Sequence, residues 1–155
     1  MDERIRMGQG ADAAADTSPQ DILACMQEAV IFADLEGIIK IWNPGAERLF
    51  GFTLEEATGQ SVDIIIPEKL RRAHWAGFNK AVEHGDILSP PGSRMTRALK
   101  KNGDALYVDM SFAMVRNQEG EMTGSIAVAR DVTARYLAER AARQGNAGNA
   151  AGAGA

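Results

Sequence analysis

Residue types that build many common functional sites are scarce in this 155-residue sequence. It contains one cysteine, Cys25, so neither a disulfide within the chain nor a metal site built from several cysteines is possible. Cys25 falls in an apolar stripe, which predicts a small buried hydrophobic residue and not a reactive thiol. No nucleophile is paired with a base, and the sequence shows neither paired carboxylates nor a metal-ligand cluster. The chain is therefore not expected to be an enzyme.

Long apolar runs are also absent. The apolar stretches are only a few residues long, far shorter than the about 18 residues that cross a bilayer. The first residues lack the basic and then apolar layout of a signal peptide. A formal net charge of -4 argues against nucleic acid as the main partner. With 45% hydrophobic residues, we expect one cytoplasmic globular domain with tails and no membrane contact.

Composition divides the chain into four parts. Residues 1–18 mix charged residues with Gly and Ala without a lasting period, and residues 145–155 contain only Gly, Asn and Ala. Both stretches are expected to be disordered tails, because neither can bury enough surface to offset its ordering entropy. The folded unit is predicted over 19–133, beginning with a helix, and a C-terminal helix is predicted over 134–144.

The hydrophobic pattern inside this unit alternates between strand and helix. Five strands are predicted, at 29–33, 38–42, 94–101, 106–114 and 123–130. Helices are predicted at 44–50, 53–58 and 67–84. The order predicts an α+β domain, in which a five-stranded antiparallel sheet carries helices packed on one face. A ligand would bind between the sheet and the helices.

The helix at 67–84 carries a histidine in its apolar stripe. Pro67 and Gly85 mark its two ends, and the stripe recurs at a spacing of three and four residues. His74 therefore points inward. It is either a core histidine bonded to a backbone carbonyl or an axial ligand for iron, and spacing alone favours the core histidine. Gly77, one turn on, leaves room beside the ring for a flat group.

Residues 41–52, Ile-Trp-Asn-Pro-Gly-Ala-Glu-Arg-Leu-Phe-Gly-Phe, resemble the hallmark of PAS sensor domains. The resemblance continues at Gly59, at 66–68, at 101–103 and at the terminal Arg-Asp-Val-Thr of 130–133. The chain is accordingly identified as a member of the PAS family. This implies the PAS fold with flanking N- and C-terminal helices, and a role in sensing or assembly.

The spacing of His74 and Arg94 resembles that in the haem-binding oxygen-sensor PAS domains of the FixL type. In those sensors the long helix carries the proximal haem histidine, and a strand arginine twenty residues later hydrogen-bonds the bound gas. The resemblance implies haem b as cofactor, His74 as its metal ligand, Arg94 as the distal donor, and sensing of O2, CO or NO. The cofactor-binding set expected from this comparison is His74, Arg94, Gly77, Phe78, Met110, Phe112 and Val128. A related oxygen-sensing phosphodiesterase has a methionine ligand where this chain has Gly92.

Other functions remain open, because PAS domains also hold flavins, organic acids, metals or only other proteins. A photoactive flavin domain needs a cysteine near the long helix, and a citrate-type pocket needs several inward basic groups; the sequence has neither. The main alternative is a homodimerisation module without haem, paired through the helix at 21–28 and the sheet, or a domain that binds another small molecule. The 130–133 segment resembles the junction that passes a signal to a partner protein or to an effector domain outside this sequence.

Overall fold

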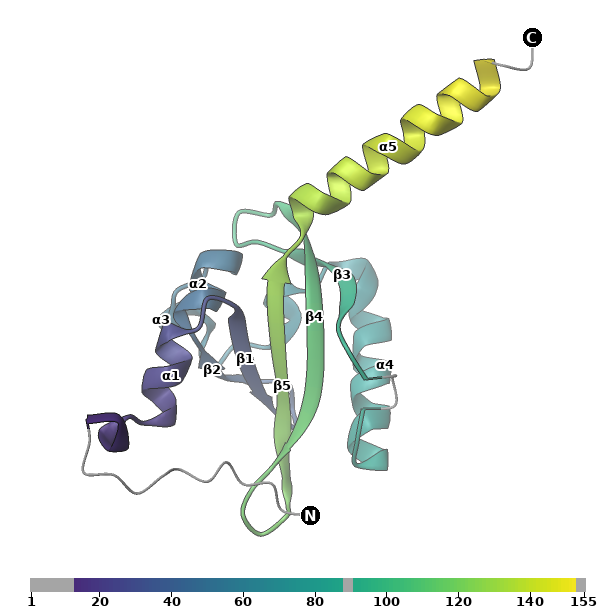
Figure 1. Cartoon of the computed structure of the whole chain (residues 1–155). Coiled ribbons are helices and arrows are strands. Elements are labelled where there is room, and N and C mark those ends of the chain that lie inside the picture. The colour runs from purple at the N-terminus through teal and green to yellow at the C-terminus, as the bar shows by residue number, and fades with distance from the viewer. Residues whose placement is uncertain (1–12, 88–90, 153–155) are drawn as a thin grey trace.

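The computed structural model describes residues 13–87 and 91–152, and its centre is a five-stranded antiparallel sheet (Figure 1). The strand order is β2-β1-β5-β4-β3. The strands are β1 (Ala29–Asp34), β2 (Ile39–Trp42), β3 (Arg94–Leu99), β4 (Ala105–Arg116) and β5 (Met122–Asp131). The predicted α+β class and the five-stranded antiparallel sheet are confirmed.

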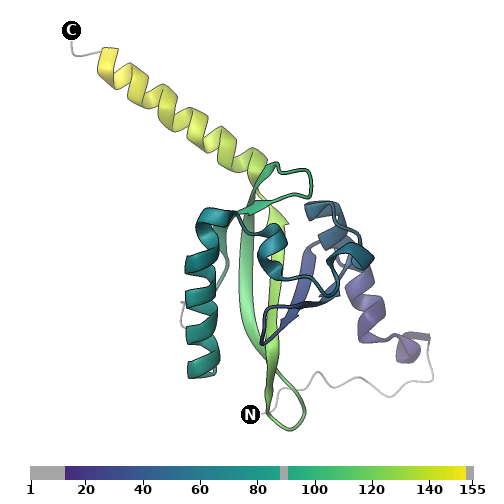
Figure 2. The same ribbon diagram turned by 180° about the vertical axis from the view of Figure 1, so that it is seen from behind.

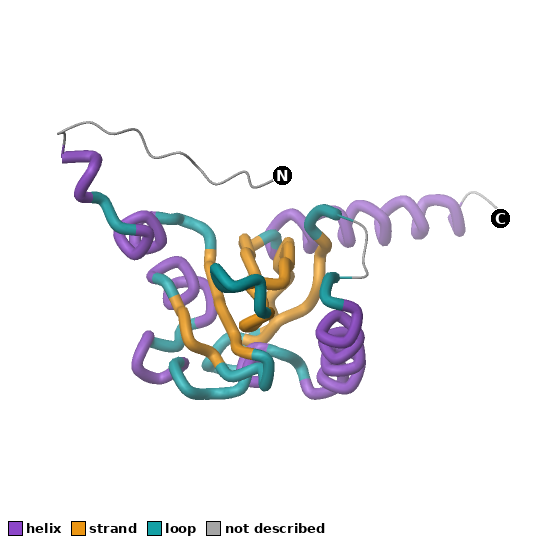
Figure 3. The backbone as a smooth tube through the Cα atoms, turned by 90° about the horizontal axis from the view of Figure 1, so that it is seen from below, coloured by secondary structure: helices purple, strands orange, loops and turns teal. Residues whose placement is uncertain are grey.

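Most helices lie near the two edges of this sheet, which are formed by β2 and β3 (Figure 2). The helices are η1 (Ala13–Asp16), α1 (Pro19–Cys25), α2 (Pro44–Phe50), α3 (Leu54–Ala57), η2 (Val62–Ile65), α4 (Glu68–His84) and α5 (Thr133–Gly152). Seen from below, α4 lies beyond the β3 edge, and α1 to α3 lie at the opposite end (Figure 3). The helix α5 projects away from the sheet (Figure 1). None of these described helices is both long and apolar enough to cross a membrane.

The hydrophobic core lies between the sheet and the helices α2, α3 and η2. Alternate residues of each strand point to this face, so that Ile31 pairs with Ala127, and Ala29 with Ala129. Phe50 of α2 and Ile65 of η2 pack against them in one cluster. The sheet is therefore covered on the face where the sequence places its apolar residues.

Asn43 joins three elements at the N-terminal end of α2. Its Oδ1 accepts hydrogen bonds from the backbone N–H groups of Ala46, at 3.0 Å, and Val30, at 2.8 Å. Its Nδ2 donates to the carbonyls of Leu23 and Glu28 at 3.1 and 3.0 Å. Asn43 is 4% exposed, so this one amide satisfies four backbone groups that water cannot reach easily.

The start of α5 is tied to the outer side of β4. Thr133 Oγ1 accepts a hydrogen bond from the backbone N–H of Tyr107 at 3.0 Å, and Asp131 Oδ1 accepts one from the N–H of Thr133 at 2.9 Å. The rings of Tyr107 and Tyr136 stack with centroids 3.7 Å apart. The base of α5 is thus bound to β4 by a hydrogen bond and by a pair of stacked rings.

Both flanking regions differ from the sequence-based expectation. The helix α5 runs to Gly152, past its predicted end at Gln144, because alanine favours helix strongly enough to carry the chain through Gly145 and Gly148. Residues 13–16 form η1 in the expected N-terminal tail. The predicted tails also include 1–12 and 153–155, which lie outside the described residues. Cys25 is exposed, so its predicted burial is wrong; the helix α1 buries none of its residues.

Candidate functional site

A cavity of about 490 Å³ lies between α4 and the inward face of the sheet. This volume is in the range of small-molecule sites. Its walls are mostly apolar, with a few polar groups among them, and include Ile31, Ile66, Leu70, His74, Gly77, Phe78, Lys80, Arg94, Thr96, Met110, Phe112, Ser125 and Ala127. An apolar space with a few polar groups suits a hydrophobic ligand that is oriented by specific contacts.

His74 faces this cavity from α4. Its Nδ1 is buried and has no hydrogen-bond partner among the described residues. Burial lowers the pKa of His74 below its usual value, and the nearby charge of Asp63 opposes part of that shift. The ring is therefore neutral near pH 7, the form in which an imidazole nitrogen can donate a lone pair.

Arg94 enters the cavity from the opposite wall, at the start of β3. It pairs in register with Met110, which is buried on the inward face of β4, and directly opposed residues share one face of a sheet. The side chain of Arg94 is exposed, so its charge remains in contact with water in this structure. The structure thus brings His74 and Arg94 to two walls of one cavity.

Four other predicted residues also line the cavity. These are Gly77, Phe78, Met110 and Phe112. Gly77 is exposed at the cavity, and a Cβ added to it would meet no atom within 4 Å. Phe78 stacks near that ring, with centroids 6.3 Å apart and an angle of 17° between the planes.

Val128 does not belong to this site. It pairs with Val30 on one side and with Ser111 on the other, whereas its neighbour Ala127 lines the cavity. Successive residues of a strand point to opposite faces. Val128 therefore lies on the outer face of the sheet and does not line the cavity, so its predicted place in the site is wrong.

The sequence patterns did not indicate several polar residues in or near the cavity, among them Lys80, Arg97 and Asp63. Lys80 lines it three residues after Gly77, a helical spacing that could have revealed it. Asp63 lies in η2 and accepts a hydrogen bond from Trp75 Nε1 at 2.8 Å. No spacing rule links Asp63 to His74, because a loop brings η2 against α4.

A bare metal ion has no matching set of protein ligands here. Among residues 13–87 and 91–152, no group of three or more His, Cys, Asp or Glu side chains could hold one. A single imidazole facing a large apolar space instead suits a flat cofactor that brings the other metal ligands itself.

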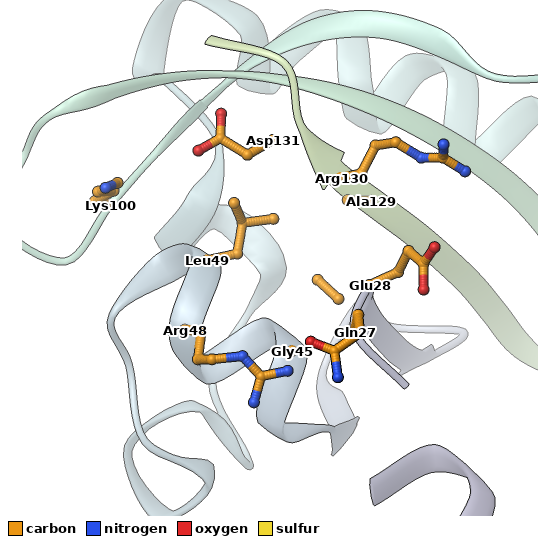
Figure 4. Close-up of a pocket in the computed structure, with 10 residues that line it drawn as sticks. Gln27, Glu28, Gly45, Arg48, Leu49, Lys100, Ala129, Arg130 and Asp131 are labelled. Atoms are coloured by element: carbon orange, nitrogen blue, oxygen red, sulfur yellow. The ribbon is translucent and has the colours of Figure 1, made fainter. Parts of the chain in front are cut away.

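A second hollow, of about 340 Å³, lies between α2 and the end of β5. Its walls are charged, with Glu28, Arg48, Lys100, Arg130 and Asp131 among them. Figure 4 shows Arg130 and Glu28 on one side of it and Lys100 on the opposite side. The charged groups do not converge on one point, so the cavity beside α4 is the stronger candidate site.

Acidification is expected to destabilise the fold through His74. Its folded-state pKa is lowered by burial, so the unfolded chain binds more protons as the pH falls below the ordinary histidine value of about 6.5. The contribution of the neutral His74 ring to the free energy of unfolding is complete above about pH 6.5. It is lost progressively as the pH falls to the folded-state pKa. Urea unfolding between pH 7.5 and pH 5 measures this loss.

The control for this experiment is His74→Leu, which removes the titrating ring from the cavity wall. Its free energy of unfolding should depend less on pH over the same interval, whereas His84→Ala, at the exposed end of α4, should behave as the wild type does. An unchanged pH dependence in His74→Leu would show that another group is responsible.

The fold and the cavity identify the class of protein. A family model described as PAS domain matches residues 27–134, and the chain belongs to that family. It is a sensory domain of the kind that serves signal transduction. A solved PAS domain of a protein from Colwellia psychrerythraea has a TM-score of 0.62 and 26% identity, covering 72% of this chain and 91% of its own.

Two curated relatives are oxygen-sensing or sensor proteins by name. Sensor protein FixL of Bradyrhizobium diazoefficiens is 41% identical over 126 residues, which are 81% of this chain and 24% of FixL. Oxygen sensor protein DosP of Escherichia coli is 29% identical over 119 residues, which are 77% of this chain and 14% of DosP. The chain therefore spans a quarter or less of the length of these relatives.

Proposed function

We propose that this domain binds haem b in the cavity between α4 and the sheet and senses a diatomic gas, with O2 as the first candidate. The observation that carries the proposal is the neutral imidazole of His74 on one wall of a 490 Å³ apolar cavity, opposite the guanidinium of Arg94. Gly77 supports it, because the space beside its Cα is open. The resemblance to FixL and DosP agrees with this chemistry.

The residues present fit the group in distinct roles. His74 would hold the iron through Nε2, because its Nδ1 is enclosed. Met110 and Phe112 would form the apolar wall on the sheet side, and the exposed cations Lys80 and Arg94 suit the anionic edge of a porphyrin. When bound, haem supplies the site for the gas, where O2 acquires partial negative charge.

A titration of the haem-free protein with haem b tests the proposal. The Soret absorption should rise and saturate at a single equivalent per chain, since one cavity accepts one cofactor. Absorption that rises without saturation, as in unspecific association, would overturn the proposal. A dimer that takes up no haem would favour the alternative of an assembly module, in which the exposed Ile22 of α1 and Leu137 of α5 meet a second copy.

Arg94 should control the affinity for O2. Arg94→Ala removes a charged hydrogen-bond donor from the cavity, and such a bond contributes roughly 1.5–3 kcal/mol, or about a tenfold to hundredfold change in affinity. The affinity for CO should fall much less, because bound CO carries little charge. Flash photolysis of the haem-loaded variant gives both constants.

Arg130→Ala is the matched control for Arg94. It removes the same charge from another strand of the sheet, but Arg130 lines the hollow between α2 and the end of β5 and not this cavity. Its O2 affinity should stay near that of the wild type. Equal losses in both variants would assign the effect to general charge and not to a contact inside the cavity.

A further inference from the structure

The orientation of His74 is not explained by a hydrogen bond. A histidine that binds a metal usually donates its other ring N–H to a carboxylate, a carbonyl or a water, and this contact fixes the ring. The Nδ1 of His74 has no such partner among the described residues, although it is buried. Some other contact must hold the ring in place.

Two aromatic residues of α4 surround the His74 ring. The ring of Trp75 meets it nearly edge-on, with centroids 5.2 Å apart and an angle of 82° between the planes. Trp75 in turn meets Phe78 at 5.6 Å and 83°, and Phe78 lies almost parallel to His74. Each ring limits the rotation of the other two, since edge and stacked arrangements are both attractive.

Trp75 is itself fixed from two sides. Its Nε1 donates a 2.8 Å hydrogen bond to Oδ1 of Asp63. Its outer ring edge lies on Gly37, where an added Cβ would stand 2.0 Å from the ring carbon Cη2. Gly37 also has a φ of +79°, a backbone conformation that residues with a side chain rarely adopt. The backbone of the turn between β1 and β2 therefore packs closely against the indole ring of Trp75.

Asp63 is itself held in place by hydrogen bonds of its backbone. Its backbone carbonyl accepts a 3.3 Å hydrogen bond from Nη2 of Arg71, whose Nε donates to the carbonyl of Ile66 at 3.1 Å. Its backbone N–H donates to Ser61 Oγ at 3.2 Å. The carboxylate that binds Trp75 thus belongs to a segment whose backbone is fixed by hydrogen bonds to Ser61 and Arg71.

We infer that Trp75, clamped between the Asp63 carboxylate and the Gly37 backbone, is the positioning residue that sets the orientation of the His74 ring toward the cavity. The inference rests on the proposed function, because a fixed imidazole matters most where it holds a cofactor. In this inference the Trp75 indole fixes the His74 ring, as a hydrogen bond to the second ring nitrogen does in most metal-binding histidines. Trp75 does not itself line the cavity.

The test compares three variants in the haem-free protein, at a pH where His74 is neutral. Asp63→Ala removes the acceptor, Trp75→Phe removes the indole N–H, and Asp63→Asn keeps an acceptor oxygen without the charge. In carbon-detected NMR spectra of the histidine rings, the His74 signals should shift and broaden in the first two variants. They should return close to the wild-type positions in Asp63→Asn.

Haem transfer to excess apomyoglobin gives the second readout. The loss of a group that orients a metal ligand typically weakens metal binding by about 10- to 100-fold, so release should accelerate by roughly tenfold or more in Asp63→Ala and Trp75→Phe. Glu56→Ala is the control, because it removes a carboxylate that serves as an N-terminal cap and pairs with Lys101 on another part of the surface. Its release rate and His74 signals should not change.

The outcomes separate the two proposals. Unchanged His74 signals in Trp75→Phe would overturn the clamp, whatever the protein does with haem. If no variant and no wild-type protein takes up haem, the proposed function fails, and the NMR comparison still decides the role of Trp75. Should Asp63→Ala not fold, Trp75→Phe and Asp63→Asn carry the same comparison.

Discussion

His74→Ala is expected to abolish the Soret band that the wild-type protein shows after haem addition. His74 is the one histidine on the cavity wall, and the described residues include no cluster of other metal ligands that could replace it. Without the imidazole, the apolar walls would hold a porphyrin only by van der Waals contact with its faces. The absorption spectrum of the variant after gel filtration measures the effect directly.

The control for this substitution is the other histidine. His84 is exposed at the end of α4, and its Nδ1 lies 2.8 Å from the carbonyl of Lys80. His84→Ala should keep the full Soret band. Imidazole added to the buffer should restore the band in His74→Ala by entering the space of the lost ring. A normal band in His74→Ala without imidazole would remove His74 from the proposed site.

Asn43→Ala should cause the largest loss of stability. The N-terminal cap of α2 is lost, at a cost of about 1 kcal/mol, and the N–H of Val30 loses its buried acceptor, at a further cost of about 1–3 kcal/mol. The carbonyls of Leu23 and Glu28 lose donors as well. We expect the free energy of unfolding to fall by roughly 3 kcal/mol, as measured by urea denaturation.

Asn117→Ala provides a matched comparison for that loss. The Asn117 side chain also accepts a backbone N–H, that of Glu121 at 2.9 Å, but it lies in the exposed turn between β4 and β5. Water can replace its hydrogen bonds, so the loss should stay below about 1 kcal/mol. Similar losses in the two variants would contradict the role assigned to the buried amide.

Local sequence signals located most of the fold. Alternating residues around Met110 placed β4, and Pro67 and Gly85 placed the ends of α4, where Gly85 adopts φ of +79° and donates to the carbonyl of Ala81. These features depend on contacts within a few residues. The end of α5 was missed because its helix propensity is spread over many alanines, while Gly145 and Gly148 locally signal a break.

The candidate site was only partly accessible from the sequence. Helical spacing gave the inward direction of His74, and the resemblance to known sensors added Arg94 on β3. Val128 was placed in the site although strand alternation puts it on the outer face. The contact of Trp75 with Asp63 and Gly37 could not be foreseen, because it joins three segments that only the tertiary fold brings together.

The central claim is that His74 holds haem in the cavity between α4 and the sheet. A crystal structure of the protein loaded with haem b tests it most directly. We expect a porphyrin in that cavity, with its iron bonded to Nε2 of His74 and with the guanidinium of Arg94 on the opposite side. Haem bound on another surface, or iron bonded to a different residue while His74 stays free, would contradict it.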